Sequence, residues 1–108
     1  MEKALDVAPV PRVLKGHAGP PPGQGPYISL RLTLLGDVIT SAVYETYQCP
    51  GCHACGKAIV DLATGKTLAE ARTLAHSDIA ARVGPLPRHR QLCYGLAVLA
   101  LSIALDQA

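Results

Sequence analysis

The stretch YISLRLTLLGDVITSAVYETYQC, residues 27–49, carries the clearest secondary-structure pattern of the chain. Apolar side chains occupy alternate positions from Ile28 to Leu34, which is the period of a strand buried on one face. Gly36-Asp37 is a turn signal, and residues 38–48 are rich in β-branched and aromatic side chains. The stretch therefore predicts an antiparallel β-hairpin that ends directly before a cysteine.

The chain before this hairpin is dominated by proline and glycine. Residues 1–26 contain six of the nine prolines, and positions 19–26 read GPPPGQGP. Proline continues neither a helix nor a central strand, so we expect a short N-terminal helical turn followed by irregular structure. This predicts an irregular segment over 1–26 and a folded domain over 27–108.

Helical signals follow the hairpin. GKAIVDLAT (56–64) predicts a helix that stops near Gly65. Thr67 and Glu70 have the spacing of a capping box, which predicts a helix through Ala75. Ser77 and Asp78 are candidate caps for a further short helix that ends near Gly84.

The last predicted helix follows the Pro85-Leu86-Pro87 break. Four apolar residues recur in it at i, i+4, i+7 and i+11, and we expect this stripe to pack on the sheet: Leu92, Leu96, Leu99 and Ile103. Strands come first and helices later. This order predicts an α+β fold, in which an antiparallel hairpin or small sheet is covered by C-terminal helices.

Composition argues against two classes of partner. The net charge of the 108 residues is only +2, with no Trp or Phe and four Tyr, so we expect no nucleic-acid binding. The longest apolar run, 93–105, is shorter than the roughly 20 residues that a membrane span needs, and two prolines interrupt the N-terminus where an export signal would need an apolar run. We therefore expect a cytoplasmic protein with reduced thiols.

The cysteines form the most informative motif. Cys49, Cys52 and Cys55 are spaced C-x2-C-x2-C, and Cys93 lies 38 residues beyond Cys55. Structural zinc sites usually pair two C-x2-C units, whereas three cysteines with a remote fourth are typical of [4Fe-4S] ligation. The pattern favours an iron-sulfur cluster held by all four thiolates, with zinc on the same four as the alternative.

The surroundings of the cysteines fit an anionic site. Helix starts lower thiol pKa values and favour negative charge, and Lys57, Arg88 and Arg90 flank the two helix starts. His53 and His89 are either solvated loop residues or replacements for a cysteine ligand. A thiol redox or sulfur-transfer enzyme would have no other evident acid-base group, so we expect a protein without enzymatic activity.

From Tyr27 to the end, the chain resembles the IscU and NifU N-terminal type of iron-sulfur cluster assembly scaffold. The likeness rests on TYQC at the end of the hairpin and on four later segments: GKTLAEA (65–71), SDIA (77–80), LPRHRQLC (86–93) and LAVLALSIALD (96–106). VPRVLKG (10–16) is similar to a segment near the N-terminus of that family. The resemblance implies an α+β scaffold fold, with a cysteine desulfurase and apo iron-sulfur proteins as partners, and it leaves open a homodimer that shares a cluster.

The resemblance also shows where this chain departs from the family. Such scaffolds use three cysteines and an aspartate, of which Cys49 matches the second cysteine and Cys93 the third. The first cysteine and the aspartate are missing, whereas Cys52 and Cys55 are additional. Thiolate is a softer and stronger ligand for iron than carboxylate, so the sequence predicts a rebuilt site that holds its cluster more tightly. Such a site suits a carrier, electron-transfer or sensing module as well as an assembly scaffold.

Overall fold

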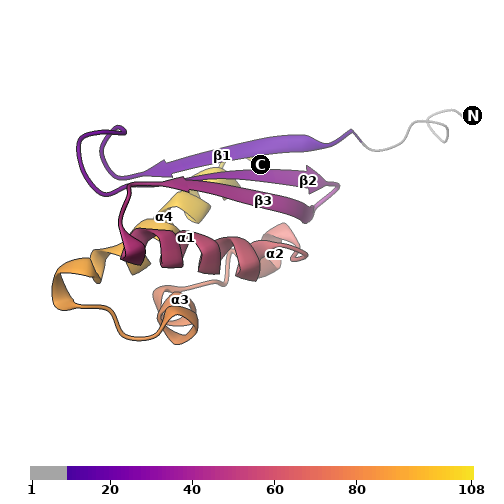
Figure 1. Cartoon of the computed structure of the whole chain (residues 1–108). Coiled ribbons are helices and arrows are strands. Elements are labelled where there is room, and N and C mark those ends of the chain that lie inside the picture. Colours follow the sequence, from indigo (N-terminus) through magenta and orange to yellow (C-terminus); the bar gives the residue numbers. More distant parts are fainter. Residues whose placement is uncertain (1–9) are drawn as a thin grey trace, which may run out of the picture.

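The computed structural model describes residues 10–108 and shows a three-stranded antiparallel sheet with helices on one face (Figure 1). The strands are β1 (Arg12–Ala18), β2 (Ile28–Leu35) and β3 (Val38–Thr46), in the order β1-β2-β3. The fold class is α+β, as the sequence predicts.

The predicted hairpin is confirmed. β2 and β3 pair antiparallel around a tight turn at Gly36, whose φ is +65°. The alternating residues of β2, from Ile28 to Leu34, are buried beneath the sheet. The hairpin therefore supplies the apolar face of the sheet against which the helices pack.

The expectation of irregular structure throughout residues 1–26 is wrong for residues 12–18, which form the strand β1. Residues 12–18 pair with β2 from Arg12 opposite Leu34 to Ala18 opposite Ile28. This strand contains no proline and buries alternate side chains, so the prolines only flank it. The predicted N-terminal helical turn lies among residues 1–9, outside the described residues.

α1 (Pro50–Ala63) begins earlier than the sequence predicts, at Pro50 rather than near Gly56. Proline is well suited to the first helical position because its missing N–H would have no partner there. Cys49 becomes the N-cap residue, and the next two cysteines lie on the helix itself instead of in turns before it. The helix ends near Gly65 as predicted, where φ is +88°.

Two short helices follow. The capping box of Thr67 and Glu70 is present at the start of α2 (Leu68–Ala71), but this helix ends before Ala75. Ala75 is extended, and its N–H donates to the Asp78 carboxylate at 2.8 Å. This contact starts α3 (His76–Val83), which ends before Gly84 as predicted.

α4 (Leu92–Leu105) follows the 3-10 turn η2 (Arg88–Arg90). Of its predicted sheet-facing stripe, Leu96 packs against the core and Ile103 is partly buried, but the prediction is wrong for the other two residues. Leu92 and Leu99 are 52% and 50% exposed, whereas the buried side is mostly small and includes three alanines: Ala97, Ala100 and Ala104. A Cβ on Gly16 would lie 2.0 Å from the carbonyl oxygen of Ala100. At this point the helix backbone lies too close to β1 for a leucine side chain between them, so alanines face β1, while Leu101 and Leu105 are buried elsewhere on the packed side.

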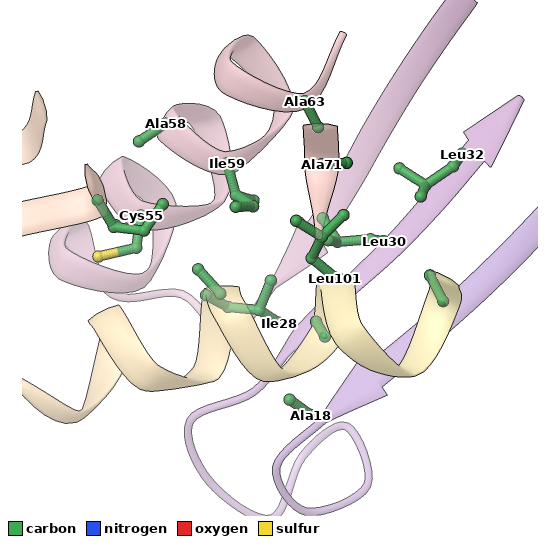
Figure 2. Close-up of a cluster of buried hydrophobic side chains, with 14 of the residues drawn as sticks. Ala18, Ile28, Leu30, Leu32, Cys55, Ala58, Ile59, Ala63, Ala71 and Leu101 are labelled. Atoms are coloured by element: carbon green, nitrogen blue, oxygen red, sulfur yellow. The ribbon is translucent and has the colours of Figure 1, made fainter. Parts of the chain in front are cut away.

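The core lies between the sheet and the helices α1 and α4 (Figure 2). Leu30 of β2, Ile59 of α1 and Leu101 of α4 meet there, all of them buried. α1 lies under β3, and α4 lies under β1 and β2 beside α1. The starts of α1 and α4 therefore come together at one end of the helical layer. Within residues 10–108 no helix combines the length and apolarity that crossing a bilayer requires.

Candidate metal centre

Three of the four cysteine thiols meet where α1 and α4 begin. Cys49 is the N-cap of α1, Cys52 lies in its first turn, and Cys93 lies in the first turn of α4. Their Sγ atoms all lie within 4.8 Å of one another, and those of Cys52 and Cys93 are 2.9 Å apart. The three side chains are buried and form no disulfide.

The η2 segment lies close to Gly51 at the start of α1. A Cβ on Gly51 would lie 3.4 Å from the Arg90 Cβ and 3.7 Å from the Cys49 Sγ. These are ordinary van der Waals distances, so the η2 segment is packed directly against the first turn of α1. This contact brings Cys93, which follows η2 directly, next to Cys52.

Cys55 is buried but does not belong to this group of three. It lies on α1, three residues after Cys52, so the two side chains share one side of the helix. Figure 2 shows Cys55 together with Ala58 and Ile59 among the buried hydrophobic side chains. The structure thus brings together three of the four predicted ligands. The fourth, Cys55, lies about one helical turn further along α1.

Cys49 is the most acidic of the four thiols. Burial acts to raise the pKa of Cys49, but hydrogen bonds from the backbone N–H groups of Cys52 and Gly51 outweigh it and hold the pKa below its ordinary value. The Cys52 thiol and the positive charge of Arg90 lower it further. Cys49 is therefore the thiol that most readily becomes a thiolate at the helix start.

The other three thiols hold their protons more strongly. Burial is the largest cause in each case: it raises the pKa of Cys52 and Cys93, and that of Cys55 to about 11. Negative charge on neighbouring cysteines adds to the increase. Because metals bind thiolates, a metal at this site must displace these protons.

A hollow of about 700 Å³ opens beside Cys49, between the end of β3 and the start of α1. Tyr44, Tyr47 and His53 contribute to its lining. The Tyr44 hydroxyl and the His53 Nδ1 lie 2.7 Å apart and share a hydrogen bond. The sequence pattern does not point to Tyr44, because apolar and polar residues do not alternate strictly along residues 38–48.

The structure sorts the other candidate groups as well. His53 and His89 are exposed and lie outside the group of three thiols. Lys57 is paired with Asp61 at 3.0 Å. Of the three predicted basic neighbours, Arg90 acts on the site, through Cys49.

The donor set suits a thiophilic metal. Three sulfurs converge in a buried position at two helix starts, where the backbone favours negative charge. Soft thiolates select zinc, Cu(I) and iron-sulfur clusters over magnesium or calcium. The donor atoms present are therefore of the type that both predicted groups, an iron-sulfur cluster and zinc, require.

A comparison with known families agrees with this fold. The model of the NifU-like N terminal domain family matches residues 16–107, which include β2, β3, all the helices and the four cysteines. No curated protein sequence is significantly similar to the chain. The family is one of iron-sulfur cluster assembly scaffolds, and the three-stranded sheet with its helices is consistent with it. The chain belongs to the NifU-like N-terminal domain family.

Proposed function

We propose that the protein binds an iron-sulfur cluster as a scaffold or carrier and catalyses no reaction of its own. The observation that supports this most is the group of buried thiols from Cys49, Cys52 and Cys93, which lies within the matched family domain. Its position at two helix starts suits a negatively charged thiolate-ligated group.

Cys55 is the proposed fourth ligand, and [4Fe-4S] is the proposed cluster. The thiol lies one helical turn from Cys52 and is buried in the direction of the core. A rotation of its side chain would turn the sulfur toward the other three. Ligation by four thiolates would hold the cluster more firmly than a site that includes a carboxylate.

The proposed partners are a cysteine desulfurase, which would supply sulfur, and apo iron-sulfur proteins, which would accept the cluster. The proposed compartment is the cytoplasm, where thiols stay reduced. Transfer is testable directly: cluster-loaded protein is mixed with an apo iron-sulfur protein, and the iron on each is measured after separation. A transient scaffold loses its cluster to the acceptor, whereas a permanent cofactor stays.

The decisive experiment is to measure iron, acid-labile sulfide and the visible spectrum on protein purified without oxygen. We expect about four iron and four sulfide per chain. Cys52→Ser and Cys93→Ser should each abolish the cluster, whereas Ala54→Ser, an exposed position on the same helix, should leave it intact. A full cluster in both cysteine variants would contradict the proposal.

One observation favours structural zinc as a second candidate. In a tetrahedral zinc site with Zn–S bonds of 2.3 Å, the sulfurs lie about 3.8 Å apart. The three thiols here are all within 4.8 Å of one another, which is close to that spacing, whereas four irons with one thiolate each need the sulfurs further apart. One zinc per chain and no sulfide would support this second function instead.

A further inference from the structure

α4 is apolar on all sides, although only one side is covered. Its sequence, LCYGLAVLALSIAL, contains no charged residue. Cys93, Ala97, Ala100 and Ala104 face the core, but Leu92 and Leu99 are half-exposed. A helix that is hydrophobic all round is normally buried all round. The exposed side of α4 therefore has the character of an interface.

The side of α4 that is turned away from the core has the spacing of a helix-pairing seam. We call four large apolar residues there the leucine face: Leu92, Leu96, Leu99 and Ile103. Leu92 and Leu99 are half-exposed, whereas Leu96 and Ile103 are partly buried along its edge, where Leu96 also packs against the core. Their intervals of four, three and four residues are those of the a and d positions of a heptad repeat. Gly95 and Ser102 are also exposed, one heptad apart, and nothing lies within 4 Å of the Cβ position of Gly95. These small residues leave room for side chains of a second helix.

We propose that the leucine face binds the leucine face of a second copy of this chain, with the two α4 helices antiparallel. Two-fold symmetry then places Leu92 of one chain opposite Ile103 of its partner, and Leu96 opposite Leu99. The face contains no charge that such pairing would bury. Self-pairing of one patch is the usual form of a two-fold dimer interface.

The charges at the two ends of α4 favour the antiparallel arrangement. Arg88 precedes the helix, and Asp106 follows it. The Asp106 carboxylate lies 3.3 Å from Arg72 but is still 70% exposed. An antiparallel pair places the basic end of one helix beside the acidic end of the other. A parallel pair would bring like charges together at both ends.

This interface is separate from the thiol site. Cys93 is on the buried side of α4, facing Cys52, while its neighbour Leu92 is on the leucine face. In the dimer each chain therefore keeps its own set of cysteines, and the two sets lie at opposite ends of the interface. The dimer does not depend on the cluster and should form in both loaded and metal-free protein.

Sedimentation equilibrium over a dilution series tests the proposal. We expect a reversible dimer for the unaltered chain and a monomer for Leu99→Glu. The matched control is Leu35→Glu, which places the same charge at a leucine of the sheet that is 42% exposed and should remain dimeric. Circular dichroism and the melting temperature show whether each variant is folded.

A charge exchange tests the orientation. Arg88→Glu and Asp106→Lys should each weaken the dimer, and the two together should restore it, because each places unlike charges opposite each other again. A folded monomer at every concentration would overturn the proposal. A dimer that survives Leu99→Glu, or one that Leu35→Glu disrupts, would also overturn it. The double exchange could instead weaken the dimer by as much as the two single changes added together. That result would overturn the antiparallel arrangement.

Discussion

Cys55 is the buried thiol that lies apart from the other three, so its role distinguishes a site of four cysteine ligands from one of three. If it is the fourth ligand, Cys55→Ser should remove most of the iron and sulfide and the visible absorption of the cluster-loaded protein. A serine hydroxyl is a harder and weaker ligand for iron than a thiolate. Iron and sulfide assays under anaerobic conditions measure the loss.

The control for this change is again Ala54→Ser, the neighbouring exposed position of α1. Retention of the full cluster in Cys55→Ser would assign Cys55 to the core and leave Cys49, Cys52 and Cys93 as the protein's own ligands. The fourth ligand would then come from outside the four cysteines.

The raised pKa of Cys55 predicts how the stability of the metal-free protein depends on pH. The pKa of the folded thiol is about 11, whereas that of the unfolded thiol is the ordinary 9.0. Between these values the unfolded state binds fewer protons, so the free energy of unfolding falls as pH rises. The contribution is fully present below pH 9 and amounts to about 3 kcal/mol.

Urea denaturation measures this dependence. It is carried out with reductant and chelator at several pH values between about 8 and 11, the interval over which the thiol titrates. Cys55→Ala should unfold with a smaller decrease over the same interval, because it lacks the titrating thiol. An equal decrease in both proteins would assign the pH dependence to other groups.

At the scale of elements, the contact between α4 and β1 depends on Gly16. A Cβ there would meet the backbone of Ala100 and Ala104 at 2.0 and 2.7 Å, and backbone cannot move aside as a flexible side chain can. Gly16→Ala should therefore lower the free energy of unfolding by about 2 to 3 kcal/mol or more. Urea denaturation measures this change. The control is Lys15→Ala, at an exposed neighbour on the same strand, which should change the free energy of unfolding by no more than about 0.5 kcal/mol.

The same contact explains which elements could be predicted from the sequence and which could not. The β2–β3 hairpin and the capping box of Thr67 are local patterns, and both are confirmed. The side of α4 that packs on the sheet is not a local property. A leucine stripe and an alanine stripe are both apolar, and the close approach at Gly16 selects the alanines.

The same distinction between local patterns and long-range contacts applies to β1 and to the candidate site. Prolines on both sides of residues 12–18 concealed a strand whose pairing with β2 is long-range. Cysteine spacing predicted that the four thiols belong together, and the structure brings three of them together, with Cys52 next to Cys93. The inward position of Cys55 depends on its side-chain rotation and on the start of α1 at Pro50, which spacing does not reveal.

At the scale of the whole molecule, the thiol group connects the two helices that cover the sheet. Cys49 and Cys52 belong to the start of α1, and Cys93 belongs to α4. A metal held by all three would cross-link parts of the chain that are about 40 residues apart in sequence. Binding to the folded state should therefore stabilise the entire domain, because the unfolded chain does not hold the thiols together.

Zinc addition to reduced, metal-free protein tests this coupling whichever metal the protein holds in the cell. At a free zinc concentration 1,000 times the dissociation constant, we expect the free energy of unfolding to rise by about 4 kcal/mol. Cys93→Ser removes the only one of the three ligands that α4 supplies, so zinc should then stabilise it far less. Cys49→Ser keeps a ligand on each helix and should retain an intermediate share of the effect. Equal stabilisation of Cys93→Ser and the unaltered protein would show that the metal binds within α1 alone, and that α1 and α4 are joined only by their apolar contacts.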